Sequence, residues 1–394
     1  MGGADAAGGE LRPPAGADRL DAVLPSVLTA IAPTGSRPYA ARPLLPLPPA
    51  RRAVVVLVDG LGDLLLRRRA GHAPFLREAL GAAYTLQCGF PSTTATSMGS
   101  FGTGLPPGAH GLVGYEVLVP GEDRILNELS WEDGPDPFAW QPERTVFELA
   151  GSLEVAVTRI GPGFFDGSGL TNAALRGGRF VAASALSARV DAALAAVRAA
   201  DRALVYLYWG DLDKVGHVHG AGSWQWGEEL ESVDRELARL AAGVPSDTTV
   251  VVTADHGMVD IPFERRLDLA LEPWLLDGVA HVGGEPRAVQ LYCRPGAAAD
   301  VAAAWRDRLG AAVQVTDRAA AVAAGLFGDP ALVAERVLPR IGDVLVSCVD
   351  PIAVVDSGRM RPELLALLGL HGSVTPQEAA IPLLVWPARA HASA

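Results

Sequence analysis

Lysine is almost absent from this chain of 394 residues, in which Lys214 is the only one. Acidic residues outnumber basic ones by 45 to 33, and the formal net charge is −12. Nucleic-acid polymers and anionic membranes both bind basic surfaces, so we expect neither as a general partner. A negatively charged substrate would need a local positive charge instead, and bound divalent cations can supply it.

Cysteine is scarce as well, with three widely separated residues, Cys88, Cys293 and Cys348. Their odd number and wide spacing argue against a disulfide scaffold and against a cysteine-rich zinc site. The sequence also lacks an apolar run of about 18 residues that could cross a membrane. Its first residues, which include Asp5 and Glu10, do not have the basic start of a secretory leader. We therefore expect a cytoplasmic location.

Apolar runs rich in β-branched residues alternate with helical patterns along most of the chain. Such runs predict strands that are buried on both faces of a parallel sheet. Ser184 is the expected N-cap of the first long helix. The alternation predicts an α/β fold with a doubly wound, mostly parallel sheet. The expected strands are residues 53–58, 153–158, 203–208, 248–253 and 381–386, and the clearest expected helices are 184–200 and 224–242.

This alternation is interrupted in two places. Residues 1–50 form a lead-in, with a short helix expected at 21–31 and a proline-rich segment at 37–49 that excludes regular structure. Residues 262–350 are predicted to be a small α+β insertion that covers the site. The remaining residues, 51–261 and 351–394, are predicted to form the α/β core. The elements expected within the insertion are strands at 288–293 and 343–349 and a helix at 298–309.

Polar residues directly follow the expected strands. Asp59 ends the first strand, Asp211 and Asp213 follow the third, and Asp255 and His256 follow the fourth. The carboxyl ends of parallel strands meet at one edge of the sheet, where α/β proteins bind ligands. A single Asp in such a position is more often a cap or a turn residue, so only the joint pattern carries weight.

Two pairs of these residues have the spacing of metal ligands. Asp213 and His217 are four residues apart, which places both side chains on one face of a helix. A carboxylate and an imidazole are suitable zinc ligands, whereas the alternative is an ordinary Asp–His hydrogen bond. His219, two residues further on, is a weaker candidate ligand. In the adjacent pair Asp255-His256, two buried polar side chains need partners, and a cation would satisfy both.

His371 is a further candidate because its neighbours have a structural explanation that does not include it. Thr375 is the expected N-cap of a short helix, Pro376 its first residue and Glu378 its capping-box partner. Gly257, after the Asp-His pair, is expected to let the backbone turn sharply beside the site.

A hydroxyl-rich segment, residues 90–104, leads into a stretch of small residues that predicts a helix. A hydroxyl there would lie near a helix N-terminus, where backbone N–H groups and the helix dipole favour a phosphate. Metal coordination can activate such a hydroxyl as a nucleophile, whereas the alternative is a cluster of caps. The hydroxyl residues are Ser92, Thr93, Thr94, Thr96 and Ser97.

These groups, in this order along the chain, resemble the alkaline phosphatase superfamily. The branch that they resemble most is the nucleotide pyrophosphatase/phosphodiesterase group, over about residues 53–386. The resemblance implies two divalent metal ions at the carboxyl edge of the sheet. Asp59, Asp255, His256 and the nucleophile would hold one ion, and Asp213, His217 and His371 would hold the other.

The resemblance also implies which hydroxyl is the nucleophile. In the family, the nucleophilic Thr follows a Pro-hydroxyl-X pattern and precedes a Thr-Gly pair, which here are Pro91, Ser92 and Thr103-Gly104. This implies Thr94, with Thr93 as the alternative. The sequence departs from eukaryotic phosphodiesterases of this group, which have Phe-Pro-Asn where Ala95-Thr96-Ser97 stands here. The Cys-X-Pro-X-Arg motif of sulfatases is not found around Cys88.

The residues and the resemblance together predict a two-metal hydrolase of phosphodiester or nucleotide pyrophosphate bonds that acts through a phospho-threonine intermediate. Zinc is the first choice of metal, although Asp/His sites also accept Mn²⁺ or Fe. The expected substrate is a small phosphoester such as a nucleotide. The alternatives are a phosphomonoesterase, a metal-dependent phosphomutase and, outside the enzymes, a metal-stabilised binding module. The sequence does not indicate an oligomeric state.

Aromatic side chains near these motifs could stack on a nucleobase, but core packing is the expected role of most of them. Lys214 is expected to face solvent. The aromatic residues are Phe90, Tyr206, Tyr208, Trp209, Trp224 and Trp226.

Overall fold

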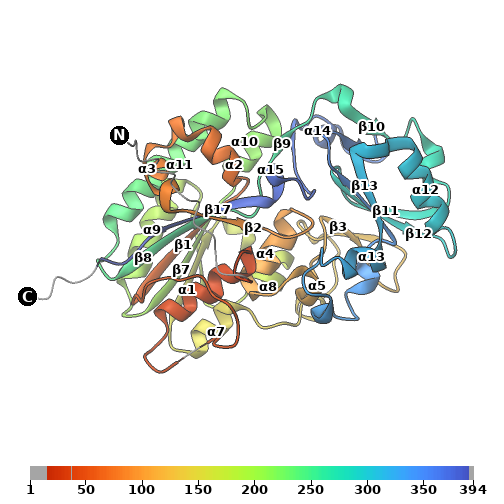
Figure 1. The fold of residues 1–394 in the computed structure, drawn as a ribbon. Coiled ribbons are helices and arrows are strands. Elements are labelled where there is room, and N and C mark those ends of the chain that lie inside the picture. The colour runs from red at the N-terminus through yellow and green to blue at the C-terminus, as the bar shows by residue number, and fades with distance from the viewer. Residues whose placement is uncertain (1–15, 37, 390–394) are drawn as a thin grey trace, which may run out of the picture.

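The computed structural model describes residues 16–36 and 38–389, which build two lobes, each around its own sheet (Figure 1). The larger lobe contains a seven-stranded sheet with the order β2-β17-β8-β1-β7-β5-β6. The last strand, β17, is antiparallel to both of its neighbours, β2 and β8. All pairs among β8, β1, β7, β5 and β6 are parallel. The strands are β1 (Arg52–Val58), β2 (Tyr84–Gln87), β5 (Ala156–Gly161), β6 (Arg179–Ala182), β7 (Ala203–Trp209), β8 (Thr248–Thr253) and β17 (Ala380–Trp386).

The predicted α/β fold with a mostly parallel sheet is confirmed. The three central strands β1, β7 and β8 are buried along almost their whole length, as their unbroken apolar runs require. The strand expected at 153–158 starts later, at Ala156, because Leu153 still caps helix α7 and Glu154 has a positive φ of 60°. The short outer strands β2 and β6 were not predicted, since neither has a long apolar run.

Helices cover both faces of this sheet (Figure 1). α1 and α7 lie on one side, and α9 and α11 lie on the other. α1 confirms the short helix expected near the start of the chain, while residues 38–49 contain no helix or strand. The expected lead-in at residues 1–15 lies outside the described part of the chain. These helices are α1 (Val23–Ile31), α7 (Val146–Ser152), α9 (Leu186–Arg198) and α11 (Trp224–Gly243).

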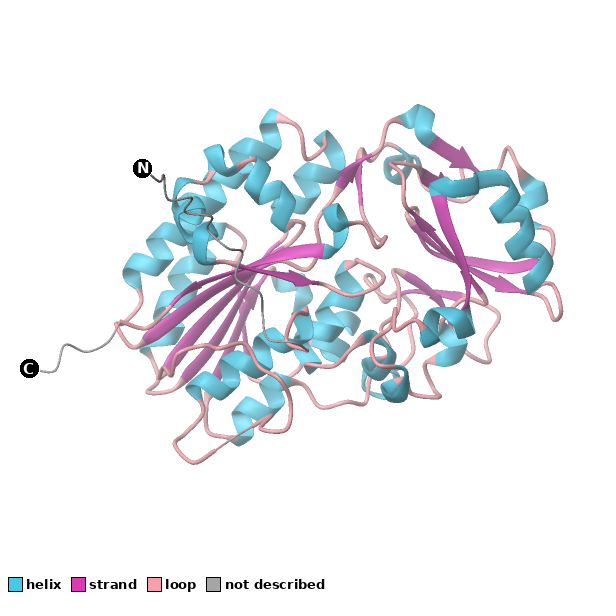
Figure 2. Cartoon of the chain, viewed as in Figure 1, coloured by secondary structure: helices cyan, strands magenta, loops and turns pink. Residues whose placement is uncertain are grey.

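The smaller lobe contains a four-stranded sheet with the order β11-β12-β14-β13, in which all neighbours are antiparallel (Figure 2). It has an apolar cluster of its own around Trp305 of α12. The elements expected at 288–293, 298–309 and 343–349 correspond to β12, α12 and β14. The domain boundaries themselves remain a prediction. The elements are β11 (Val279–Glu285), β12 (Ala288–Cys293), α12 (Ala298–Leu309), β13 (Val313–Asp317) and β14 (Val344–Cys348).

Short elements connect the two sheets and complete the described chain. A hairpin of β3 and β4 packs against β11. No helix in residues 16–36 or 38–389 is long and apolar enough to cross a membrane. The remaining helices are α2 (Asp63–Arg68), α3 (Pro74–Ala79), α4 (Thr94–Thr103), α5 (Pro107–His110), α6 (Pro137–Trp140), α8 (Gly169–Ala174), α10 (Asp211–His219), α13 (Arg318–Ala323), α14 (Pro362–Leu365) and α15 (Pro376–Ala379), and the remaining strands are β3 (Glu116–Leu118), β4 (Ile125–Asn127), β9 (Val259–Asp260), β10 (Arg266–Asp268), β15 (Ala353–Val355) and β16 (Gly369–Leu370).

Two serines at helix starts provide a matched test of capping. Ser223 caps α11, where its side chain accepts a hydrogen bond from the backbone N–H of Trp226. The predicted cap Ser184 is wrong, because α9 begins only at Leu186 and the side chain of Arg189 binds the Ser184 carbonyl. We expect Ser223→Ala to lower the free energy of unfolding by about 1 kcal/mol, and Ser184→Ala to change it by less than about 0.5 kcal/mol. Urea unfolding of both variants checks this, and equal losses would contradict it.

Candidate active site

The carboxyl ends of the parallel strands face the smaller lobe. β17 runs from the middle of the molecule toward the C-terminus at the left of Figure 1, and its neighbour β8 runs in the opposite direction. Asp59 directly follows β1, Asp255 lies two residues beyond the end of β8, and α10 begins shortly after β7. These polar residues therefore lie together at the carboxyl ends of the parallel strands, as the sequence predicts.

Asp59, Asp255 and His256 form the first of two triads. Each residue offers one ligand atom, and the three atoms lie within 4.8 Å of one another. The Nε2 atom of His256 is 3.4 Å from an oxygen of each carboxylate. All three residues are buried, with exposures of 3%, 0% and 0%. Oδ1 of Asp59 and Oδ2 of Asp255 have no hydrogen-bond partner, so a buried acceptor on each carboxylate is free to bind a cation.

Asp213, His217 and His371 form the second triad, with ligand atoms that also lie within 4.8 Å of one another. The spacing of four on α10 brings His217 Nε2 to 3.2 Å from Asp213 Oδ2. All three are only partly buried, so solvent reaches this triad more easily than the first. His219 is not part of the triad, because it is exposed and lies beside Gln225.

All three triad histidines are held in the same way. Each Nδ1 atom lies 2.7–3.0 Å from a backbone carbonyl oxygen, to which it donates in the tautomer that leaves Nε2 free. In two of them Nε2 is also the atom that faces a carboxylate of the triad. Such a bond fixes the ring and its tautomer, as is usual for histidines that bind metal. The carbonyls belong to Gly257, Gly369 and Ser92 and hold His256, His217 and His371, respectively.

The two triads are neighbours. The rings of His256 and His371 stack with their centroids 3.6 Å apart, and the rings of His217 and His371 are 5.2 Å apart. Gly60 permits this approach: its φ is +71°, and a Cβ at this position would lie 3.0 Å from the side chain of Asp213. The six side chains therefore form one polar cluster with two centres.

Thr94 is the first residue of α4, at the edge of the first triad. Its hydroxyl lies 3.3 Å from Nε2 of His256. Two other hydroxyls of this segment make structural bonds instead, since Ser92 donates to the Ser373 carbonyl and Ser97 donates to the Asp255 carbonyl. Thr93 is buried and serves as the N-cap residue, although its side chain makes no capping bond.

The charges of the cluster are unbalanced without a cation. Burial, together with the charges of Asp255 and Asp213, raises the pKa of Asp59 well above its usual value. Burial and the charge of Asp213 raise the pKa of Asp255 to about 7. Burial acts against the His217 imidazolium, but the charge and hydrogen bond of Asp213 prevail and raise the pKa of His217 to about 9. Burial, assisted by the charge of His256, lowers the pKa of His371. A divalent cation would favour the ionised carboxylates and the neutral histidines.

Two residues at the site were missed by the sequence analysis. The Tyr208 hydroxyl donates a hydrogen bond to Oδ2 of Asp59, although Tyr208 was considered only for stacking or packing. Glu285, at the end of β11 in the smaller lobe, has Oε2 at 3.8 Å from Nδ1 of His371. Burial raises the pKa of Glu285 to about 8, against the hydrogen bond of Thr93. Neither Tyr208 nor Glu285 belongs to a sequence motif, so only the tertiary structure shows that they lie beside the triads.

The Tyr208 hydroxyl offers a test of the first triad. Because it binds one oxygen of Asp59, it orients the other oxygen toward His256. We expect Tyr208→Phe to weaken zinc binding by about tenfold or more, as is typical when a partner of a metal ligand is lost. Isothermal titration of the metal-free variant with zinc measures this. Unchanged affinity would show that Asp59 is oriented by other contacts.

The structure refines two expectations about the loops. Gly257 does not have a positive φ; it is needed because a Cβ there would lie 2.0 Å from the Gln377 carbonyl oxygen. Thr375 occupies the N-cap position of α15 and Pro376 its first residue, but Thr375 makes no capping bond to the backbone. The carboxylate of Glu378 accepts a hydrogen bond from the Thr375 hydroxyl and also pairs with buried Arg287.

Most of the aromatic residues have the packing role that was expected. Phe90, Tyr206, Trp209 and Trp226 are buried in the main apolar cluster, and Trp224 is exposed. Lys214 faces solvent and pairs with Asp211, at 2.7 Å, so neither residue takes part in the triads.

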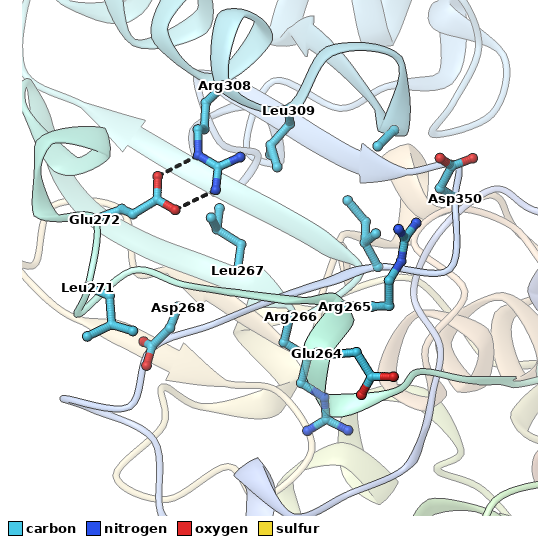
Figure 3. Close-up of a pocket in the computed structure, with 12 residues that line it drawn as sticks. Glu264, Arg265, Arg266, Leu267, Asp268, Leu271, Glu272, Arg308, Leu309 and Asp350 are labelled. Carbon is cyan, nitrogen blue, oxygen red and sulfur yellow. Dashed lines mark hydrogen bonds and ion pairs between the residues drawn. The ribbon is translucent and has the colours of Figure 1, made fainter.

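A cavity of about 440 Å³ lies in the smaller lobe, between the segments around Arg266, Arg308 and Asp350 (Figure 3). The Arg308 guanidinium forms two hydrogen bonds with Glu272 at its wall. None of its lining residues belongs to the triads, so this cavity is separate from the candidate active site.

The fold is that of alkaline phosphatase-like hydrolases. The structure superposes on murine ectonucleotide pyrophosphatase/phosphodiesterase 5, an inactive variant in complex with AMP, with a TM-score of 0.66, 17% identity and coverage of 84% of this chain and 87% of that one. Phosphonoacetate hydrolase from Sinorhizobium meliloti 1021, in complex with phosphonoformate, also gives a TM-score of 0.66, with 21% identity and coverage of 88% and 92%.

The sequence matches the family described as Type I phosphodiesterase / nucleotide pyrophosphatase over residues 53–374. The chain belongs to this family, which confirms the predicted resemblance. A search of curated protein sequences with this chain found no match.

Proposed function

We propose that this protein hydrolyses phosphodiester or nucleotide pyrophosphate bonds, with two divalent metal ions in the triads and Thr94 as the nucleophile. One observation carries the proposal: a partly exposed hydroxyl at the N-terminus of α4 lies 3.3 Å from a ligand atom of the first triad, beside the second. Family membership supports the hydrolase class.

The side chains present fit two cations. Three carboxylate oxygens of the triads, one each from Asp59, Asp213 and Asp255, are buried without a hydrogen-bond partner. Three imidazoles have Nδ1 beside a backbone carbonyl, which leaves Nε2 available. This set of oxygen and nitrogen donors suits Zn²⁺, and it also accepts Mn²⁺ or Fe. Bound cations would lower the pKa of the Thr94 hydroxyl and neutralise phosphate oxygens.

The residues of the chain then have distinct tasks. Thr94 supplies the oxygen that attacks phosphorus; the bond to the first alcohol or phosphate breaks, and the phosphorylated threonine keeps the second ester group. The N-terminus of α4 directs backbone N–H groups and its dipole toward the phosphate. The partly open second triad is the side from which substrate and water arrive. Water then attacks the same phosphorus, which releases the phosphate monoester and restores the Thr94 hydroxyl.

We propose a diester rather than a monoester as the substrate, because the family is that of phosphodiesterases and pyrophosphatases. A monoester dianion usually needs an arginine or another cation beside two metals. A diester carries a single negative charge and needs no such partner. Because one structural neighbour was solved with AMP, we propose nucleotides as the first substrate class.

The test is a comparison of substrates with zinc-loaded protein. We expect bis(p-nitrophenyl) phosphate to turn over faster than p-nitrophenyl phosphate, and turnover to stop when the metal is chelated. Faster monoester turnover would indicate a phosphatase. A mutase would turn over neither ester and would instead convert a sugar phosphate to its isomer without free phosphate. Phosphonoacetate is included because a neighbouring structure is a phosphonoacetate hydrolase. Zinc binding without turnover of any of these compounds would favour the binding-module alternative.

A further inference from the structure

The tip of the β11–β12 hairpin inserts a charged side chain between the two lobes. Arg287, just before β12, is 1% exposed and faces Glu378 of α15, which is fully buried. Nε and Nη2 of the guanidinium each donate a 2.7 Å hydrogen bond to one oxygen of the Glu378 carboxylate. This pair has the bidentate geometry that makes arginine–carboxylate contacts specific in direction as well as in charge.

The other donors of Arg287 are bound to the smaller lobe. Nη1 donates to the carbonyls of Asp350 and Ile352, at 3.0 and 2.6 Å. Nη2 also approaches the carbonyl of Cys348, at 3.4 Å. The guanidinium is therefore held by the smaller lobe, whereas Glu378 belongs to the helix that leads directly into β17 of the main sheet.

The Glu378 carboxylate is connected to the second triad by four hydrogen bonds. Oε1 accepts from the backbone N–H of Ser373, at 3.0 Å. The Ser373 carbonyl accepts from the Ser92 hydroxyl, which in turn accepts from the N–H of Gly372. The Ser92 carbonyl lies 2.8 Å from Nδ1 of His371. The Arg287–Glu378 pair thus fixes the loop that carries His371.

Among the described residues, no side-chain hydrogen bond joins the first triad to this pair, and the side-chain contact between the two regions is the stacking of His256 on His371. Asp59 and Asp255 follow central strands of the sheet, and Asp255 accepts from backbone N–H groups of Gly60 and His256. The contact of Glu378 with this region is made by its backbone carbonyl, which accepts from Gly257 N at 2.7 Å. Removal of the Glu378 carboxylate would leave that contact in place.

We propose that Arg287 is a positioning residue that acts through Glu378 to fix His371 and so sets the metal affinity of the Asp213/His217/His371 triad. The assignment of these three as ligands rests on the proposed function. Apolar residues can often replace a buried ion pair without loss of stability. Partners behind a metal-binding histidine, by contrast, change metal affinity by about 10- to 100-fold. The position of the pair behind His371 therefore points to a functional role.

The test uses the full chain and removes both charges at once. Arg287→Met alone would leave the Glu378 carboxylate buried without its partner and would destabilise the fold. The double variant R287M/E378M avoids this, and R287K tests whether charge without the bidentate geometry is sufficient. The control is R318M/D343N, because the 2.8 Å pair of Arg318 and Asp343 lies in the smaller lobe away from the His371 loop, although it is more exposed than the Arg287–Glu378 pair. Thermal unfolding in chelator and calorimetric titration of metal-free protein with zinc are measured for each variant.

We expect R287M/E378M to melt close to the wild type in chelator and to bind one zinc ion normally and the second about 10- to 100-fold more weakly. Adding His217→Ala to the double variant should leave the affinity of the normally bound ion, that of the first triad, unchanged. The control R318M/D343N should bind both ions like the wild type. Two ions bound with wild-type affinity, or two ions weakened equally, would overturn the proposal.

The same titration separates this proposal from the proposed function. A wild type that binds two zinc ions but hydrolyses no ester would refute the function and leave the positioning role standing. Hydrolysis by the wild type, with unchanged zinc affinities in R287M/E378M, would refute the positioning role alone. A wild type that binds no metal would refute both.

Discussion

Replacing Thr94 by alanine is expected to lower kcat by about five orders of magnitude, the scale seen when a catalytic nucleophile is removed. Metal content and thermal stability should stay close to those of the wild type. Thr94 is only partly buried, and its hydroxyl makes one contact, at 3.3 Å to Nε2 of His256. The two triads keep all their own atoms in this variant, so both ions should stay bound although the first loses the Thr94 hydroxyl. Initial rates with bis(p-nitrophenyl) phosphate and zinc content per chain check both parts.

Two control variants determine whether the hydroxyl itself is responsible. Thr94→Ser keeps a nucleophilic oxygen and should retain activity within about tenfold of the wild type. Thr93→Ala removes the neighbouring hydroxyl, which lies on the side of Glu285 rather than His256. If Thr93→Ala were inactive and Thr94→Ala active, the nucleophile would be Thr93. Acid quenching during turnover of bis(p-nitrophenyl) phosphate, followed by peptide mass spectrometry, should locate a p-nitrophenyl phosphoryl group on the peptide that contains Thr94.

The sequence alone predicts the centre of the fold well, because local patterns determine it. β1 and β8 are buried on both faces, and an unbroken apolar run is the expected consequence. The Asp213/His217 pair could be recognised because the helical period brings residues four apart together. Edge strand β6 is half exposed and has no such run. The start of β5 was misplaced because a left-handed residue, Glu154, is not specified by any local pattern.

The connections behind the site could not be predicted, because they join segments that are distant in the sequence. Tyr208 binds Asp59 across 149 positions, and Arg287 binds Glu378 across 91. Each partner has a plausible local explanation, as a strand aromatic or as a capping residue, and nothing in the sequence contradicts it. Glu378 keeps its local contact with the Thr375 hydroxyl and also binds the buried guanidinium, because a charge inside the protein requires a partner.

Replacing Asp255 by asparagine is expected to have opposite effects on stability with and without metal. In the metal-free protein, burial and the charge of Asp213 raise the pKa of Asp255 to about 7. A carboxyl group whose pKa is higher in the folded state destabilises the fold once the pH exceeds the pKa of the unfolded chain, and this cost is complete above pH 7. The variant keeps the acceptor for the Gly60 and His256 N–H groups and loses the charge. At pH 8 in chelator, the variant should therefore melt at a higher temperature than the wild type.

Zinc should reverse this order. At a free concentration of about 1,000 times Kd, one bound ion stabilises the folded state by about 4 kcal/mol, which corresponds to a rise in Tm of about 5 °C for a chain of this size. In the wild type, each of the two bound ions should contribute such a rise. In Asp255→Asn, the contribution of the first triad should be lost, together with nearly all turnover. Asp63→Asn is the control, because Asp63 is equally buried but pairs with Arg67 outside the triads. If Asp255→Asn lowered Tm equally with and without zinc, the role of the carboxylate would be to accept the hydrogen bonds of the loop, and it would not hold a metal ion.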